Sequence, residues 1–169
     1  MNQKRKRGIF LNRSIFRKVA VFAAAILLPL AVGGLSALIS ASGMESYESL
    51  ARPPFAPPAI LFPIVWTVLY ILMGISSAFV YESDSPVKRE SLTVYLLQLT
   101  VNGLWSPIFF LWNARLIAFF WLLLLIAFIC LMIYLFSKGS RIAAYLQIPY
   151  LIWCLFASVL NFSVWYLNK

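Results

Sequence analysis

Five long uncharged stretches dominate the hydrophobic pattern of this chain. With polar or charged residues between them, they run over 19–39, 59–81, 92–112, 116–136 and 144–167. Each is long enough to cross a bilayer as a helix, because about 20 residues cover the roughly 30 Å hydrocarbon core. None shows the alternation of polar and apolar residues that transmembrane barrel strands require. The pattern therefore predicts an all-α integral membrane bundle of five transmembrane helices.

The first stretch follows a basic segment and ends in small residues, which is also the pattern of a cleaved signal peptide. The apolar core of a signal peptide is only about 7 to 15 residues long, whereas the uncharged run here extends from Val19 to Met44. The sequence therefore favours a retained helix. It divides the chain into a basic N-terminal arm, 1–18, and a transmembrane domain, 19–169.

Composition agrees with a membrane protein and excludes other classes. Hydrophobic residues make up 63% of the 169 residues and charged residues only 11%, whereas soluble domains carry about 25% charged residues. The chain is too apolar to be disordered, and two cysteines are too few for a disulfide scaffold. The formal net charge of +9 raises the question of nucleic acid. The cations form no stripe with interleaved aromatic residues, so no nucleic-acid partner is expected.

The distribution of cations predicts the orientation in the membrane. Eleven of the 14 Lys and Arg residues lie in the N-terminal arm and in the two loops on the same side, and three lie on the other side. The positive-inside rule then places the N-terminus in the cytoplasm and the C-terminus outside. The expected location is a cell membrane of the bacterial type.

The one long loop, Gly43–Pro58, contains two proline pairs. Proline fixes its own φ and favours extended geometry in the preceding residue, so we expect a stiff, polyproline-like segment from Arg52 to Pro58. One interpretation is a helix stop and spacer. The other is a lid over the outer mouth of the bundle.

The spans lack most of the residues that carry chemistry. The chain has no histidine, no span contains Asp or Glu, and Cys130 and Cys154 lie on different predicted helices. Imidazole ligation of haem is therefore impossible, and a zinc site or a relay of buried carboxylates is not expected. We predict no catalytic residues, no metal and no required cofactor.

What the spans do carry is amide and aromatic side chains. Gln98, Asn102 and Trp105 share one face of the third predicted helix, and Trp66 and Tyr70 share one face of the second. An amide without a partner in lipid costs several kcal/mol. These amides must therefore join helices to one another or contact water or a ligand.

A third polar and aromatic face is predicted in the last helix, where Tyr150, Trp153, Ala157 and Asn161 lie near one stripe. Prolines interrupt or begin four of the five spans, at Pro29, Pro63, Pro107 and Pro149. Kinked helices can leave a cavity between them. Lined by aromatic rings and a few amides, such a cavity would suit a flat, mostly apolar ligand.

Three blocks of the sequence resemble the translocator protein, or tryptophan-rich sensory protein, family. The first runs from Arg52 through the proline pairs and on to Gly74, the second from Gln98 to Phe110, and the third from Pro149 to Asn168. They occur in the family's order and spacing, and the resemblance extends over about 19–169. It implies a five-helix bundle, usually dimeric, that binds porphyrins such as protoporphyrin IX, sterols and synthetic planar ligands.

The resemblance also implies site residues. The pocket would be lined by Trp66, Asn102, Trp105, Trp153 and Ala157, to which the shared helical faces add Tyr70 and Gln98. The lid would comprise Arg52, Pro53, Phe55, Pro57 and Pro58. Many family members carry tryptophan where this chain has Phe55, which removes that indole from any photochemistry. Residues 164–169 satisfy a loose sterol motif that is common by chance, and we do not predict sterol binding from it.

Three functions follow from the pocket chemistry and the resemblance. The leading hypothesis is a membrane receptor or sensor that binds tetrapyrroles. The alternatives are a transporter of porphyrin or of lipid or sterol, and a protein that degrades porphyrin with light or oxygen, which would make it an enzyme. Gly33 with Ala37 and Gly74 with Ala78 allow helices to approach closely. They could serve a homodimer or packing within one chain.

Overall fold

The computed structural model describes residues 2–169, with side chains for 15–43 and 49–169. Its elements are α1 (Asn2–Glu48), α2 (Leu61–Glu82), α3 (Lys88–Ser106), the π-helical turn η1 (Pro107–Leu111), α4 (Arg115–Gly139), α5 (Arg141–Leu146) and α6 (Ile148–Leu167). The described part contains no strand. Five of its segments are long and apolar enough to cross a membrane: Ile15–Gly43, Leu61–Glu82, Lys88–Leu111, Arg115–Gly139 and Arg141–Leu167. The predicted all-α bundle of five spans is confirmed.

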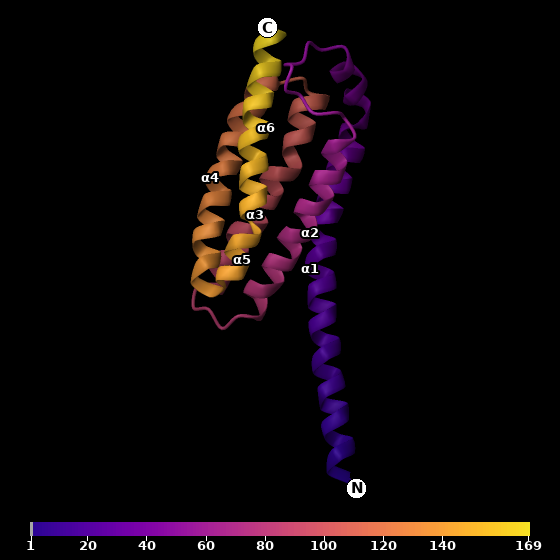
Figure 1. Ribbon diagram of the computed structural model, residues 1–169, viewed down its shortest axis with the longest axis vertical. Helices are drawn as coiled ribbons and strands as arrows, with labels where there is room; N and C mark the ends of the chain where they lie inside the picture. Colours follow the sequence, from indigo (N-terminus) through magenta and orange to yellow (C-terminus); the bar gives the residue numbers. More distant parts are fainter. Residues whose placement is uncertain (1) are drawn as a thin grey trace.

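The helices run side by side along the long axis of the molecule (Figure 1). The α1 helix packs on α2, α3 and η1, whereas α4 packs mainly on α3 and α6. The N-terminus and the C-terminus lie at opposite ends of the bundle, as an odd number of spans requires. The connections α2–α3 and α4–α5 lie at one end, and the proline-rich segment lies at the end where α6 finishes.

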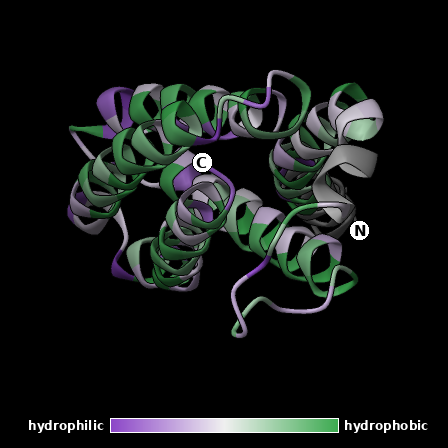
Figure 2. Ribbon diagram, turned by 90° about the horizontal axis from the view of Figure 1, so that it is seen from above, coloured by the Kyte–Doolittle hydropathy of each residue, from purple (hydrophilic) through white to green (hydrophobic). Residues whose placement is uncertain are grey.

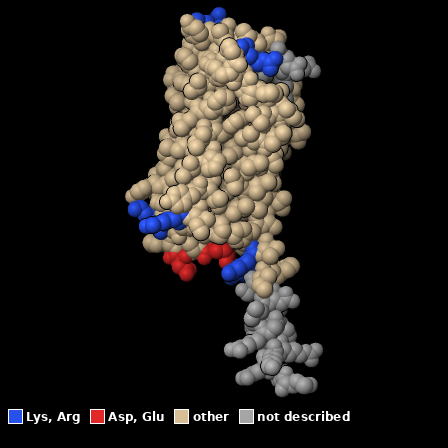
Figure 3. Space-filling view, in the orientation of Figure 1, with Lys and Arg blue, Asp and Glu red and all other residues tan. Residues whose placement is uncertain are grey.

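The surface is that of an integral, multi-pass membrane protein. Large apolar side chains point outward along the spans, among them Leu38, which is 74% exposed, and Ile152, which is 61% exposed. Figure 2 shows hydrophobic residues on the outer faces of the helices as well as between them. In the face shown in Figure 3, Lys and Arg side chains lie toward both ends, Asp and Glu side chains lie at one end, and the middle is free of charge. The orientation in the cell stays a prediction.

The first helix is longer than the sequence pattern indicated. We expected a loop to begin at Gly43, but α1 continues to Glu48. The glycine does not end the helix, because its missing side chain serves packing instead: a Cβ there would overlap the backbone carbonyl of Phe110 in η1. The loop is therefore confined to 49–60.

The expectation of a continuous polyproline-like segment is wrong in its middle. The Ala56 N–H donates to the Pro53 carbonyl at 2.9 Å, which closes a turn over 53–56. Proline at the second position of a turn has the required φ already, and Pro54 occupies that position. The turn folds the chain back, so the segment is compact rather than extended.

Two glycines let helices of the same chain approach closely. A Cβ on Gly74 in α2 would lie 2.7 Å from the Ala25 carbonyl oxygen and 2.8 Å from the backbone nitrogen of Ile26 in α1. A Cβ on Gly33 in α1 would overlap the ring of Tyr70 in α2. Both small residues thus serve packing within one chain. A homodimer stays a prediction.

Serine hydroxyls satisfy carbonyls that the breaks in the helices leave without a partner. Pro107 has no N–H to offer to the carbonyl of Gly103, four residues earlier, and Ser36 of α1 donates to that carbonyl at 2.6 Å. Between α5 and α6, the Gln147 N–H bonds to Ala144. The Ala143 carbonyl is left over and accepts from Ser76 of α2 at 2.7 Å. These hydrogen bonds fix neighbouring helices at the points where the spans bend.

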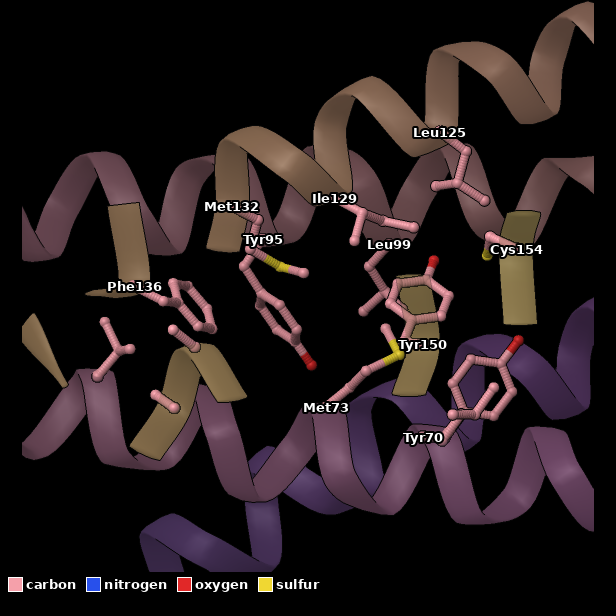
Figure 4. Packing of buried hydrophobic residues seen from close by; sticks show 14 of the residues in the cluster. Tyr70, Met73, Tyr95, Leu99, Leu125, Ile129, Met132, Phe136, Tyr150 and Cys154 are labelled. Atoms are coloured by element: carbon pink, nitrogen blue, oxygen red, sulfur yellow. The ribbon is translucent and has the colours of Figure 1, made fainter. Parts of the chain in front are cut away.

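The main hydrophobic core lies between α2, α3, α4 and α6, and buried polar side chains such as Gln98 and Asn102 lie within the same interior. Figure 4 shows Met73, Leu99, Ile129 and Tyr150 filling the space between these helices. Close packing around them holds the buried polar side chains of α2, α3 and α6 in fixed positions.

Candidate functional site

A buried hydrogen-bond network joins three helices in the middle of the bundle. The Tyr70 hydroxyl of α2 donates to Asn102 Oδ1 of α3 at 2.8 Å. Asn102 Nδ2 donates to the Tyr150 hydroxyl of α6 at 2.9 Å, and that hydroxyl donates to Gln98 Oε1 at 3.0 Å. We call these four residues the amide–tyrosine network. They do join helices, which was one of the two expected roles for the amides.

Each amide of the network keeps some capacity for a further partner. Gln98 Nε2 is buried and has no partner among the described residues. The Asn102 amide has two N–H groups and an oxygen with two lone pairs, and one donor and one acceptor position are used by the two tyrosines. The network therefore does not exclude contact with a ligand.

An aromatic cluster lies beside this network. Trp66 stacks on Tyr70 with ring centroids 5.4 Å apart, and it meets the Tyr150 ring edge to face at 6.1 Å. The ring of Trp153 meets that of Phe62 edge to face, with ring centroids 5.9 Å apart. The ring centroids of Phe156 and Trp153 are 5.5 Å apart. The aromatic cluster thus comprises rings from α2 and α6, namely Phe62, Trp66, Tyr70, Tyr150, Trp153 and Phe156. The cluster and the network share both tyrosines, so they form a single site.

The remaining two predicted pocket residues lie near this site. Trp105, one turn after Asn102, is half-buried and stacks on Phe109 of η1 at 5.1 Å. It packs against the main core and also against a smaller one around Phe109. Ala157 is half-buried on α6 and packs against the main core. The place of Trp105 in the site therefore rests on its position along α3, one turn from the network.

The proline-rich segment, which we call the lid (Arg52–Pro58), is held at Ala51, the residue just before it, and by one aromatic contact of its own. Asn168, just after α6, donates from Nδ2 to the Ala51 carbonyl at 2.9 Å and accepts from the Ala51 N–H at 3.0 Å. The Phe55 ring meets Phe156 of the aromatic cluster at 6.4 Å. Pro53 is buried, whereas Arg52, Phe55 and Pro58 are exposed and Pro57 is half-buried. The lid thus touches the cluster through one aromatic residue.

We predict that the paired hydrogen bonds of Asn168 to Ala51 fix the start of the lid against the end of α6. Replacing it (Asn168→Ala) removes both bonds to Ala51, each of which contributes about 1 kcal/mol. Amide hydrogen exchange within 49–60 should become about tenfold faster, as measured by mass spectrometry. The neighbouring change Lys169→Ala serves as the control, because Lys169 only lies over the rings of Trp165 and Tyr166. Equal exchange in Asn168→Ala and the unmodified protein would refute this role.

Several buried polar atoms around the site have no hydrogen-bond partner in the described part of the chain. They include the indole Nε1 atoms of Trp105 and Trp153 and both amide atoms of Asn161. By contrast, Trp121 on α4 donates its Nε1 to the Val101 carbonyl at 2.7 Å. An unsatisfied donor in a membrane interior is costly. These atoms are therefore available to a ligand or to water.

The side chains of the network and the cluster are uncharged. Aromatic faces bind flat apolar molecules, while indole N–H groups and amides hold carbonyl, carboxylate or ring nitrogen acceptors of a ligand. The only groups among these side chains that could act as an acid, a base or a nucleophile are the Tyr70 and Tyr150 hydroxyls, and both are engaged in the network.

Sequence reasoning left four contributors out of the predicted site. Tyr150, the centre of the network, was placed on the same helical face as Trp153 by its spacing but was not counted among the pocket residues. Phe62 and Phe156 flank predicted residues at helical spacing, but aromatic residues are too common in this chain to stand out. Asn168 gave no signal, because its role depends on a contact with Ala51 far away in the sequence.

Comparison with known proteins agrees with this architecture. Residues 25–167 match the model of the TspO/MBR family. The tryptophan-rich protein TspO of Archaeoglobus fulgidus is 38% identical over 153 residues, which cover 86% of this chain and 95% of that protein. Protein CrtK of Rhodobacter capsulatus is 36% identical over 124 residues, covering 72% and 78%. The translocator protein of Ovis aries is 33% identical over 136 residues, covering 78% and 79%.

These matches confirm the resemblance seen in the three sequence blocks. The family model covers most of the chain and includes the lid, the network and the aromatic cluster. The chain belongs to the TspO/MBR family.

Proposed function

We propose that this protein is a membrane receptor or sensor that binds a tetrapyrrole such as protoporphyrin IX between α2, α3 and α6, beneath the lid. Family membership supports a receptor, sensor or transporter role in the membrane. Tetrapyrrole binding is proposed because two half-buried indoles, Trp105 and Trp153, have Nε1 atoms without a hydrogen-bond partner in the described residues. Trp153 belongs to the aromatic cluster and Trp105 stacks on Phe109 of η1, so a flat ligand beside either indole would find a ring face and a hydrogen-bond donor.

The chemistry of the ligand matches that of the site. A porphyrin is a broad planar ring system whose faces stack on Trp66 and Trp153, and whose edge carries acceptors for indole N–H and amide groups. An aromatic pair contributes about 0.5 to 1.5 kcal/mol beyond the area that it buries. Burying most of a large apolar ligand supplies the main part of the affinity.

A titration with protoporphyrin IX tests this proposal. The change in porphyrin absorbance is followed, so that removing tryptophans does not remove the probe. Replacing both indoles (Trp66→Ala with Trp153→Ala) should raise Kd about 10- to 100-fold, because each loses stacking and buried area. The single change Trp153→Phe keeps a ring but removes the N–H donor, and should raise Kd several-fold.

The matched control is Trp112→Phe, since Trp112 is an exposed indole, 65% exposed, in the α3–α4 connection. Its Kd should equal that of the unmodified protein. An unchanged Kd in the double variant, or an equal loss in Trp112→Phe, would show that the porphyrin binds elsewhere.

Sealed vesicles distinguish a receptor from a transporter. We expect bound porphyrin but no net movement into the vesicles, because the described spans carry carboxylates only at their ends, Glu82 and Glu90, and none in their interior that could couple movement to protons. Sustained accumulation inside the vesicles would support the transporter instead. Recovery of a chemically altered porphyrin, lost in the double variant, would support degradation.

A further inference from the structure

A hollow lies at the end of the bundle opposite the lid. It is an open groove of about 630 Å³ at the connection from α2 to α3. Its lining includes Asp84 of the connection and, on α3, Lys88, Arg89, Leu92 and Leu96. None of these residues belongs to the network, the cluster or the lid.

The groove changes from charged to apolar along α3. Lys88 and Arg89 are the first residues of the helix, Leu92 lies one turn further, and Leu96 lies two turns further and is 50% exposed. At 1.5 Å per residue, these positions extend over about 12 Å. Because both neighbouring spans end at this level, the cations lie where lipid headgroups lie, and the leucines lie beside the acyl chains.

The side chains that line the groove carry an excess of one positive charge, and Glu90, beside Arg89 on α3, lies outside the lining. Lys88 and Arg89 oppose the single carboxylate of Asp84, and no ion pair joins Asp84 to either cation in the described part of the chain. A phosphodiester between the two cations would neutralise this excess. The carboxylate can accept hydrogen bonds from a headgroup that carries hydroxyl groups.

We propose that this groove binds phosphatidylglycerol from the surrounding leaflet. The phosphate lies between Lys88 and Arg89, a hydroxyl of the headgroup donates to Asp84, and one acyl chain follows Leu92 and Leu96 into the membrane. A zwitterionic lipid would leave the positive charge of the groove unbalanced, which is why we assign an anionic one.

Native mass spectrometry of the detergent-solubilised full chain tests the assignment. The protein is titrated with phosphatidylglycerol and, separately, with phosphatidylcholine of the same acyl chains. We expect phosphatidylglycerol to bind about tenfold more tightly. The paired change Lys88→Ala with Arg89→Ala should abolish that preference, while binding of phosphatidylcholine stays the same.

The matched control is Lys138→Ala with Arg141→Ala, which removes the same charge near the same end but outside the groove lining. It should keep the tenfold preference. Equal loss in the control would mean that general surface charge attracts the lipid, and would overturn the site. So would equal affinity for the two lipids.

A third arm adds glycerol phosphate, which carries the phosphate but no acyl chain. It should leave phosphatidylglycerol bound, because Leu92 and Leu96 contact only the chain. Displacement at an equal concentration would overturn the lipid assignment in favour of a free phosphate ester.

Discussion

Replacing Gly74 by valine should destabilise the folded protein by about 3 kcal/mol or more. A Cβ at this position would overlap the backbone of Ile26, and it would lie 2.7 Å from the Ala25 carbonyl oxygen. Neither group can rotate away as a side chain could, so α1 and α2 must separate. Overpacking normally costs about 1 to 3 kcal/mol, and here the obstacle is backbone, which places the cost at the upper end or beyond it.

Equilibrium unfolding in mixed micelles of mild and denaturing detergent measures this loss. Gly34→Ala is the control, since a Cβ on Gly34 would meet nothing within 4 Å. That change should be neutral or stabilising by up to about 1 kcal/mol, because alanine is the better helix former. If both variants unfolded at the same detergent fraction as the unmodified protein, the close contact between α1 and α2 would be refuted.

Much of the fold follows from the sequence because membrane helices can be recognised by their length and hydrophobicity. Lipid supplies no hydrogen bonds, so a long uncharged run has few alternatives to a helix. The ends of the helices were harder to predict. Gly43 looked like a stop, but its role is set by the approach of η1, which belongs to a distant part of the chain. The turn over 53–56 closes through the Ala56 N–H. Because proline fits both a turn and an extended segment, the proline pairs alone did not distinguish the two.

The sequence predicted which site residues share a face of the same helix, but not how the faces of different helices meet. Spacing placed Gln98 with Asn102 and Trp66 with Tyr70, because each pair lies on one helix. It could not show that Tyr150 bridges both amides, since that depends on how α6 is rotated against α3. The rotation is set by packing across the whole core, and no short segment encodes it.

The second large effect is expected from the amide–tyrosine network. Replacing Asn102 by leucine keeps the approximate size of the side chain but leaves the Tyr70 hydroxyl without its acceptor. A buried hydroxyl without a partner costs about 1 to 3 kcal/mol, and the bond to Tyr150 is lost as well. Asn102→Leu should therefore destabilise the protein by about 3 kcal/mol in the same detergent assay. Thr100→Val is the control, because Thr100 is exposed and its hydroxyl bonds only within α3.

A double-mutant cycle with Tyr70→Phe separates the network from simple packing. Tyr70→Phe alone should cost about 1 kcal/mol. Combined with Asn102→Leu, it removes the stranded hydroxyl, so the pair should cost about 1 kcal/mol less than the sum of the two single changes. Strict additivity would mean that the 2.8 Å bond between Tyr70 and Asn102 contributes nothing. The contact between α2 and α3 at this point would then rest on apolar surfaces, and Asn102 Oδ1 would remain as an acceptor for a ligand while its Nδ2 still bonds to Tyr150.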